Sequence, residues 1–456
     1  EVYRQATPSD ASFNTAGWKS SYTGRPIPEA EMWDWVGHTV ERIRAGRPRR
    51  VWEIGCGSGL LLLRLAPHCQ SYWGTDFSAE ALRLLEQQVP QLGLTNVTLS
   101  ARDAGDFSDV KPGSFDAVIL NSVVQYFPDL DFLSNLLQQA IQAVGPGGFV
   151  FVGDVRNLAL LKAFHGSVEL ARAPEGLAVA DWERRLRRQA EEERELLIDP
   201  GFFNQLADRC PSLGRVEIQL KRGRHHNELT CFRYDVVLHV STDQREPEPG
   251  RNSLRALESG TAAHRSSGEW LAWTTDAITL ETLRQKLIDQ QPSELGLRGI
   301  PNARLEKILA ALQVAESENG VRTAGELRAA LEKMPRRGME PEDFWALGSE
   351  LGYGVETRWS DTGSPGTYDV VMRRRDQHVA VEPNGSEHGS AGSSERTRPA
   401  GASPNEDDWR RRGSADLQSA VPQDCILRGV DQTDRFGRSD AQPTASRRYG
   451  RLKICA

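Results

Sequence analysis

The chain has 456 residues, a mass of 50.6 kDa, a formal net charge of −7 and a pI near 5.8. This length is typical of two or three domains, and the acidity excludes a nucleic-acid binder whose affinity comes from neutralising phosphates. No apolar run reaches the roughly 18 residues of a membrane span. Six cysteines without CxxC spacing and nine histidines without metal-ligand spacing predict neither a disulfide framework nor a metal site.

These properties predict a cytoplasmic protein that binds neither nucleic acid nor a membrane. The chain begins at Glu1 instead of Met, and no segment with the charge and apolar pattern of a signal peptide follows. We therefore expect a fragment of a larger protein.

Four segments differ in composition. Residues 1–240 alternate strand-like apolar runs with helical patterns, which is typical of an α/β domain with a mainly parallel sheet. Residues 241–267 are polar and predict a linker. Residues 268–375 show helical periodicity and end in two short strand candidates, which predicts a small α+β accessory lobe closed by a hairpin. Residues 376–456 lack periodicity and are rich in polar residues, Gly and Pro, so we expect a disordered tail.

The first strand of the α/β domain runs into a glycine-rich turn. Residues 51–54 are an apolar strand, and a helical pattern begins after Gly55, Gly57 and Gly59. Glycines let the backbone approach a ligand, which the helix N–H groups then face. Because Glu53 stands two residues before the first glycine, the pattern is E-x-G-x-G-x-G and not the G-x-G-x-x-G of a dinucleotide site. A tight strand-to-helix turn in an unrelated α/β protein is the alternative.

This pattern resembles the class I S-adenosylmethionine-dependent methyltransferases. The resemblance implies a Rossmann-like, seven-stranded, mostly parallel sheet with helices on both faces. It implies that S-adenosyl-L-methionine is the cofactor, that Glu53 organises the loop near positive ligand charge, and that the glycine amides donate to the cofactor carboxylate. Asp76, at the end of the second strand candidate, has the position of a carboxylate that accepts both ribose hydroxyls.

Later strand ends supply further cofactor-binding candidates. Residues 97–100 predict a third strand that leads to Asp103 and Ala104. In the resembled family an acid at this turn takes the adenine amino group, and the next backbone amide meets a ring nitrogen. A fourth strand ends at Asn121, and the turn through Gln125 lies where open α/β sheets bind ligands. Before the glycine strand, Tyr22 predicts either an aromatic lid over the cofactor or a segment that packs on the sheet.

Four longer strings resemble, more narrowly, the methyltransferase domains embedded in nonribosomal peptide synthetases. They are residues 13–24, 121–127, 153–166 and 221–237. The resemblance covers residues 11–240 well and extends more loosely to residue 375. In that family the methyl group usually goes to the α-amino nitrogen of a carrier-bound aminoacyl thioester, and some relatives methylate carbon or oxygen. The implied partners are adenylation and carrier domains of a synthetase.

Methyl transfer to an amine needs little chemistry from the protein beyond alignment and one group that orients the nitrogen and removes a proton. His226 and Glu228 lie two apart between the last two strand candidates, so an extended loop would place them on the same side. We predict that Glu228 and His226 form this catalytic pair, with Asp154, at the end of the fifth strand, as a further candidate. The alternatives are a solvated hairpin turn at residues 221–228 and a helix cap at Asp154.

Three functions remain open at this point. The first is a methyltransferase acting on the amino nitrogen of a carrier-bound aminoacyl or peptidyl intermediate. The second is an O- or C-methyltransferase acting on a small molecule or a polyketide-type intermediate. The third is a non-catalytic, truncated remnant that retains cofactor binding, although the intact glycine pattern and strand-end acids argue against decay of the cofactor site. No serine-centred carrier attachment motif is evident, so a carrier would come in trans or from adjoining sequence.

Overall fold

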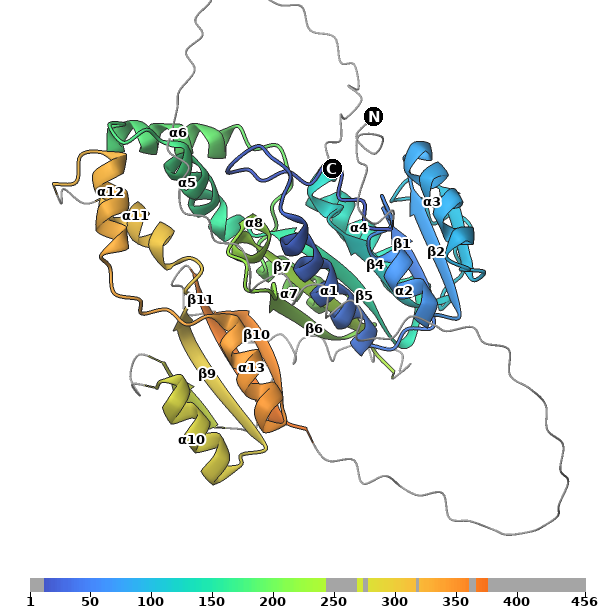
Figure 1. Ribbon diagram of the computed structural model, residues 1–456. Coiled ribbons are helices and arrows are strands. Elements are labelled where there is room, and N and C mark those ends of the chain that lie inside the picture. Colours follow the sequence, from blue (N-terminus) through green and yellow to red (C-terminus); the bar gives the residue numbers. More distant parts are fainter. Residues whose placement is uncertain (1–11, 243–268, 274–277, 317–319, 361–365, 376–456) are drawn as a thin grey trace, which may run out of the picture. The chain divides into compact units, whose positions relative to one another are not determined.

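Two β-sheets organise the residues that the computed structural model describes, which are 12–242, 269–273, 278–316, 320–360 and 366–375 (Figure 1). All of them belong to one compact unit. The predicted linker lies almost entirely outside the described residues, and the predicted disordered tail lies outside them completely. Within the described ranges, no helix is long and apolar enough to span a membrane.

The first sheet has seven strands in the order β3-β2-β1-β4-β5-β7-β6. Strands β1 to β5 pair in parallel, and β7 runs antiparallel to both β5 and β6. The predicted seven-stranded, mostly parallel sheet is therefore confirmed. The strands are β1 (Arg50–Ile54), β2 (Ser71–Asp76), β3 (Val97–Ala101), β4 (Phe115–Asn121), β5 (Val144–Arg156), β6 (Leu213–Leu220) and β7 (Arg233–Val240).

Helices cover both faces of this sheet, as predicted, because alternate strand residues are buried on opposite sides. In β1, Val51 packs into the core that contains α1 and α3, whereas Trp52 packs into the core that contains α4 and α7. The helices of this part are α1 (Glu29–Ala45), α2 (Leu62–Leu65), α3 (Ala79–Gln91), α4 (Leu130–Ala143), α5 (Leu161–Arg172), α6 (Val179–Glu191), α7 (Gly201–Arg209) and α8 (Glu228–Phe232).

The accessory lobe is built on the second sheet, with the strand order β10-β11-β9-β8. The predicted hairpin is present, because β10 and β11 pair antiparallel. The structure adds two strands that the sequence did not predict, and β9 lies between β11 and β8. The lobe contains β8 (Glu269–Ala272), α10 (Leu280–Gln290), β9 (Glu294–Pro301), α11 (Glu306–Glu316), α12 (Ala324–Glu332), α13 (Pro341–Leu351), β10 (Tyr353–Trp359) and β11 (Thr367–Arg374).

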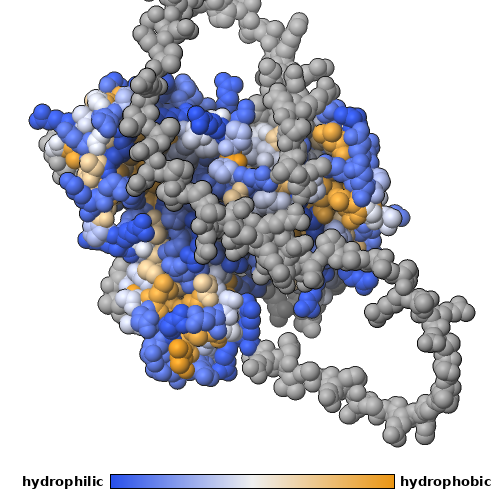
Figure 2. Space-filling model, viewed as in Figure 1, coloured by the Kyte–Doolittle hydropathy of each residue, from blue (hydrophilic) through white to orange (hydrophobic). Residues whose placement is uncertain are grey.

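Part of the lobe shares an apolar core with the helices that follow β5. Leu305 and Ile308 pack with Trp182 and Leu186 of α6, whereas α10 and α13 pack on the second sheet itself. In the view of Figure 2, hydrophobic residues visible over the lobe lie among hydrophilic ones. The lobe is therefore joined to the first part by buried side chains.

Candidate active site

The glycine turn after β1 has a backbone that only glycine adopts easily. Gly55, Gly57 and Gly59 have φ angles of +76°, +50° and +80°. A Cβ atom on Gly55 would lie 2.5 Å from Val123 Cγ2, and one on Gly59 would lie 2.4 Å from Leu85 Cδ2. The turn is therefore packed closely between the β4 exit and α3. The expectation that its glycine amides donate to the cofactor carboxylate is not met, because the Gly55 and Gly59 N–H groups donate to the carbonyls of Thr75 at 2.7 Å and Cys56 at 2.9 Å, and that of Gly57 donates to Asp76.

Asp76 ties this turn to the next helix. Its Oδ2 accepts the Gly57 N–H at 2.9 Å, and its Oδ1 accepts the N–H of Ser78, the residue that caps α3, at 2.8 Å. Burial raises the pKa of Asp76 above its ordinary value. A carboxylate has about four acceptor positions, so lone pairs remain for further donors such as ribose hydroxyls.

Glu53 lies in the interior of the sheet beneath the glycine turn. Its Oε2 accepts the hydroxyl of Tyr72 at 2.7 Å. Burial, together with the charge of Asp76, raises the pKa of Glu53 to about 8. This hydrogen bond ties the Glu53 side chain to β2.

The exit of β4 carries two buried amide oxygens that lack donors. Among the residues that the structure describes, no hydrogen-bond partner is found for Asn121 Oδ1 or for Gln125 Oε1. A Cβ atom on Gly153 would lie 2.2 Å from Asn121 Oδ1, so glycine is what leaves room for this amide. An unsatisfied buried acceptor costs about 1–3 kcal/mol. The ammonium and hydroxyl groups of S-adenosylmethionine are donors of the kind that would remove this cost, so these residues fit the cofactor.

Asp103 and Ala104 follow β3 at the same edge of the sheet. The last residue of β3, Ala101, pairs with Asp76, and the N–H of Arg102 donates to the Asp76 carbonyl at 3.0 Å. The Asp103 side chain is exposed and Ala104 is half-buried. The chain therefore leaves β3 next to the end of β2, and Asp103 and Ala104 are the second and third residues after β3.

Residues 12–28, which we call the N-terminal cover, run from the glycine turn to α5. The carbonyl of Asn14 accepts the Ser58 hydroxyl at 2.7 Å, and the Tyr22 hydroxyl lies 2.9 Å from Ser167 Oγ (dark blue loop beside α5 in Figure 1). Burial raises the pKa of Tyr22, which therefore remains a neutral phenol. The cover thus contacts the glycine turn through Asn14 and α5 through Tyr22.

Glu228 is the first residue of α8 and holds the cover in place. Its two carboxylate oxygens accept the Ser21 N–H at 2.9 and 3.1 Å, and they also accept the hydroxyls of Ser21 at 2.9 Å and Ser20 at 3.4 Å. The side chain is buried. Glu228 is therefore an interior carboxylate, which excludes a fully solvated turn at this residue.

The expected extended loop that pairs His226 with Glu228 is not present. Asn227 caps α8 in a capping box with Thr230, so the chain turns into a helix between the two side chains. His226 instead places its Nε2 2.7 Å from Oε2 of Glu340 in the lobe. The structure therefore gives the two predicted partners separate contacts.

Asp154 lies at the centre of a buried polar cluster. Its oxygens accept the Trp35 indole N–H at 3.1 Å, the Ser122 hydroxyl at 2.6 Å and the guanidinium of Arg233. Burial alone would raise the pKa of Asp154, but the charges of Arg233 and Lys221 hold it below its ordinary value. The alternative of a helix cap is wrong, because these side chains take the hydrogen bonds. A carboxylate so fully paired is a weak base.

Sequence reasoning missed the cations of this cluster. One alternative from the sequence places Lys221 in a solvated hairpin turn. Its side chain is instead 2% exposed, and its Nζ lies 2.9 Å from Asp235 Oδ1. The signal that could have found it is Asp235 itself, an acid inside an otherwise apolar strand, which needs a cation to be buried. In the described ranges, no group of three His, Cys, Asp or Glu side chains is close enough to hold a metal ion.

Comparison with known proteins points to the same part of the chain. Residues 52–150, from β1 into β5, match the family model described as a methyltransferase domain. The chain carries a methyltransferase domain. The prediction of an S-adenosylmethionine-dependent methyltransferase is thereby confirmed, and S-adenosylmethionine is its cofactor.

The methyltransferase also resembles segments of much larger synthetases. It is 42% identical over 375 residues to chondramide synthase cmdD of Chondromyces crocatus, which covers 80% of this chain and 9% of that protein. It is 30% identical to the beauvericin nonribosomal cyclodepsipeptide synthetase of Beauveria bassiana, over 81% of this chain and 12% of that protein. The structure of the N-methyltransferase NodS from Bradyrhizobium japonicum WM9 matches 46% of this chain and 97% of its own, with 18% identity and a TM-score of 0.33. The methyltransferase domain is therefore related to those of nonribosomal peptide synthetases.

Proposed function

We propose that the protein transfers a methyl group to the amino nitrogen of a carrier-bound aminoacyl or peptidyl intermediate in nonribosomal peptide synthesis. One observation carries this proposal. The similarity to chondramide synthase runs over 375 residues, which is more than the first sheet and its helices contain, so it includes the accessory lobe. A shared lobe favours a shared kind of acceptor over an unrelated small molecule.

The cofactor side of the site follows from the strand ends. When bound, S-adenosylmethionine supplies an electrophilic methyl group on a sulfonium. We propose that the backbone of the glycine turn lies against the cofactor, that Asp76 accepts the ribose hydroxyls, and that Asp103 and the Ala104 amide bind the adenine. The remaining proposed cofactor-binding residues are Glu53 beneath the turn, Asn121 and Gln125 with their free amide oxygens, and Tyr22 in the cover.

The acceptor side requires one group that orients the amine. In the proposed reaction the nitrogen forms a bond to the methyl carbon while the carbon–sulfur bond breaks, and the nitrogen then releases a proton. We propose Glu228 for this role, because its buried carboxylate accepts from the neutral donors of Ser20 and Ser21, whereas that of Asp154 is bound by the guanidinium of Arg233. His226 and Asp154 are held by Glu340 and Arg233, so we propose that they position the site without acting as bases.

The partners belong to the same proposal. An aminoacyl or peptidyl group tethered to a carrier domain would be the substrate, and an adenylation domain would load that carrier. Both would be supplied in trans or by adjoining sequence. We propose a cytoplasmic location for this assembly.

A pair of matched acceptors tests the function. The protein is incubated with methyl-labelled S-adenosylmethionine and one carrier protein that bears either an aminoacyl thioester or the corresponding hydroxyacyl thioester. We expect label on the aminoacyl carrier alone, detected as a one-methyl increase in its intact mass. Label on the hydroxyacyl carrier would favour O- or C-methylation, and cofactor binding without transfer to either would favour the remnant.

A further inference from the structure

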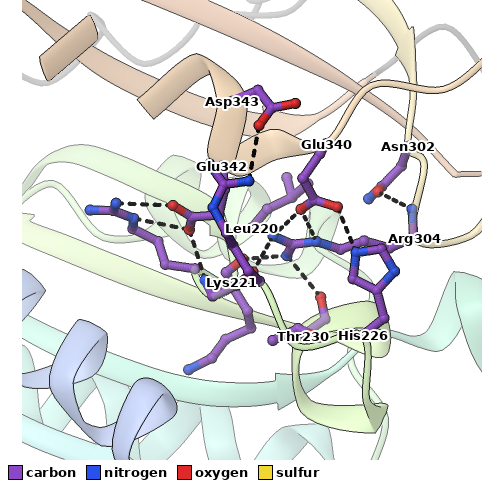
Figure 3. Close-up of polar contacts among 12 residues, drawn as sticks. Leu220, Lys221, His226, Thr230, Asn302, Arg304, Glu340, Glu342 and Asp343 are labelled. Atoms are coloured by element: carbon purple, nitrogen blue, oxygen red, sulfur yellow. Dashed lines mark hydrogen bonds and ion pairs between the residues drawn. The ribbon is translucent and has the colours of Figure 1, made fainter. Parts of the chain in front are cut away.

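One arginine of the lobe reaches into the connection between β6 and β7. We call residues 221–232 the β6–β7 connection. The side chain of Arg304 is fully buried. Its Nη1 donates to the carbonyls of Lys221 at 2.6 Å and Thr230 at 3.3 Å (Figure 3). Its Nη2 donates to the carbonyl of Gly223 at 2.7 Å. Its Nε donates to Glu340 at 2.6 Å. A single side chain thus satisfies three carbonyls at both ends of the connection.

Acids at the start of α13 hold the same connection from a second side. Glu342 is buried and accepts the Gly223 N–H at 2.7 Å (Figure 3). It also accepts from Nη2 and Nε of Arg222, at 3.1 and 3.2 Å. Glu340 also binds His226. Backbone groups held by buried charges are costly to release, because the loss leaves unsatisfied carbonyls and amides. The lobe therefore determines where the connection lies.

The connection in turn holds the cover. Thr230, whose carbonyl Arg304 binds, lies two residues after Glu228 in the short helix α8. Glu228 binds the amide and hydroxyl of Ser21. The lobe is therefore linked to the N-terminal cover in three steps: hydrogen bonds from Arg304 to the β6–β7 connection, the backbone of α8 from Thr230 to Glu228, and hydrogen bonds from Ser21 to Glu228.

We propose that Arg304 is a positioning residue that sets the place of Glu228 and of the cover from outside the first sheet. The lobe then supports the acceptor side of the site directly. The hydrogen bonds that hold Gly55 and Gly57 to β2 do not pass through this series, so its loss leaves the glycine turn in place while Tyr22 moves with the cover. The kinetic part of this proposal rests on the proposed function, whereas the structural part does not.

Hydrogen exchange of the full chain tests the structural part without any acceptor. The variant is Arg304→Gln, and the matched control is Arg284→Gln, which breaks the exposed ion pair of the lobe with Glu350. We expect at least tenfold faster amide exchange in residues 18–27 for Arg304→Gln, unchanged exchange in residues 50–60, and no change in either for the control. Faster exchange confined to the lobe and the connection would overturn the proposal. Should Arg304→Gln fail to fold, Glu340→Gln loosens the same guanidinium more mildly.

A double-mutant cycle tests the kinetic part. Ser21→Ala removes one contact at the far end of the series. We expect it and Arg304→Gln each to lower kcat about tenfold and to raise the KM for the cofactor by a smaller factor, because Tyr22 is the cover's one proposed contact with the cofactor. If both act through Glu228, the double variant is no slower than the slower single variant, because coupled sites are not additive. Additive effects would overturn the relay. If the unaltered protein transfers no methyl group at all, the proposed function fails, and the exchange result alone decides this inference.

Discussion

Asp76 connects the glycine turn after β1 to the start of α3. One of its oxygens holds the glycine turn through Gly57, and the other holds the first turn of α3 through Ser78. Its carboxylate is buried, so a substituted side chain would leave two amides without an acceptor.

The variant Asp76→Ala is expected to weaken S-adenosylmethionine binding at least 30-fold. A hydrogen bond to a charged group contributes about 1.5–3 kcal/mol, and the variant loses contacts to the turn as well as those proposed to the ribose. Calorimetric titration measures the change. Asp131→Ala, at an exposed position on α4, is the control and should bind normally. Unchanged affinity in Asp76→Ala would remove the ribose assignment.

Glu228→Gln separates a chemical role from a structural one. The amide keeps an acceptor oxygen for Ser21 but removes the charge that orients and deprotonates an amine, so we expect kcat to fall about 100-fold, within the usual range for a general base. Cofactor affinity should stay within about twofold, and Glu217→Gln, which alters a carboxylate bound to His239, should retain full activity. Full turnover by Glu228→Gln would show that this carboxylate only anchors the cover.

Glu53 makes stability depend on pH in a direction that can be worked out. Its pKa is about 8 when folded against an ordinary value of 4.5, so between these pH values the folded state keeps a proton that the unfolded state has released. The free energy of unfolding therefore falls as pH rises through this interval, by at most about 1.4 kcal/mol per pH unit from this group. Urea unfolding at pH 5 and pH 8 should show a smaller fall for Glu53→Gln. An identical fall in both proteins would contradict the raised pKa.

At the scale of elements, the glycine turn is constrained both by its backbone and by its neighbours. Gly55 and Gly93 both have positive φ, at +76° and +68°, but only Gly55 is packed against another side chain. The two positions therefore separate backbone strain from steric overlap.

Gly93→Ala should cost about 1 kcal/mol of unfolding free energy, from backbone strain alone, and leave cofactor affinity unchanged. Gly55→Ala should cost more, because the added methyl group overlaps Val123, and it should lower cofactor affinity at least tenfold. Denaturant unfolding and calorimetry measure the two quantities. Equal effects on affinity at both positions would mean that the packing of the turn is not what shapes the site.

Helix α8 shows why the acceptor side was harder to predict than the cofactor side. Asn227 and Thr230 form a capping box, but a five-residue helix is too short to show a periodic pattern in the sequence. Alternation alone therefore suggested that His226 and Glu228 share a face. The glycine turn was predictable because its strand, its three glycines and the acid at the end of the next strand lie within about 25 residues of one another in the sequence.

At the scale of the whole molecule, contacts between distant segments decide what the sequence could not. Arg304 binds carbonyls more than 70 positions away in the chain, and Lys221 is buried by Asp235 on the neighbouring strand. The acid inside β7 indicates that some cation is buried there, but no local pattern identifies which one. The succession of strands and helices along residues 1–240 was predictable, because each element has its own pattern of apolar residues. The strands β8 and β9 and the packing of the lobe on the first part could not be predicted in this way.

The most direct measurement locates the transferred methyl group by its bonded neighbour. A carrier bearing a ¹⁵N-labelled aminoacyl thioester is incubated with the protein and S-adenosylmethionine labelled with ¹³C in the methyl group, and the product is examined by nuclear magnetic resonance. The account predicts a one-bond ¹³C–¹⁵N coupling on the product. A methyl signal without that coupling, or no methylated product with a cofactor-bound protein, would contradict it.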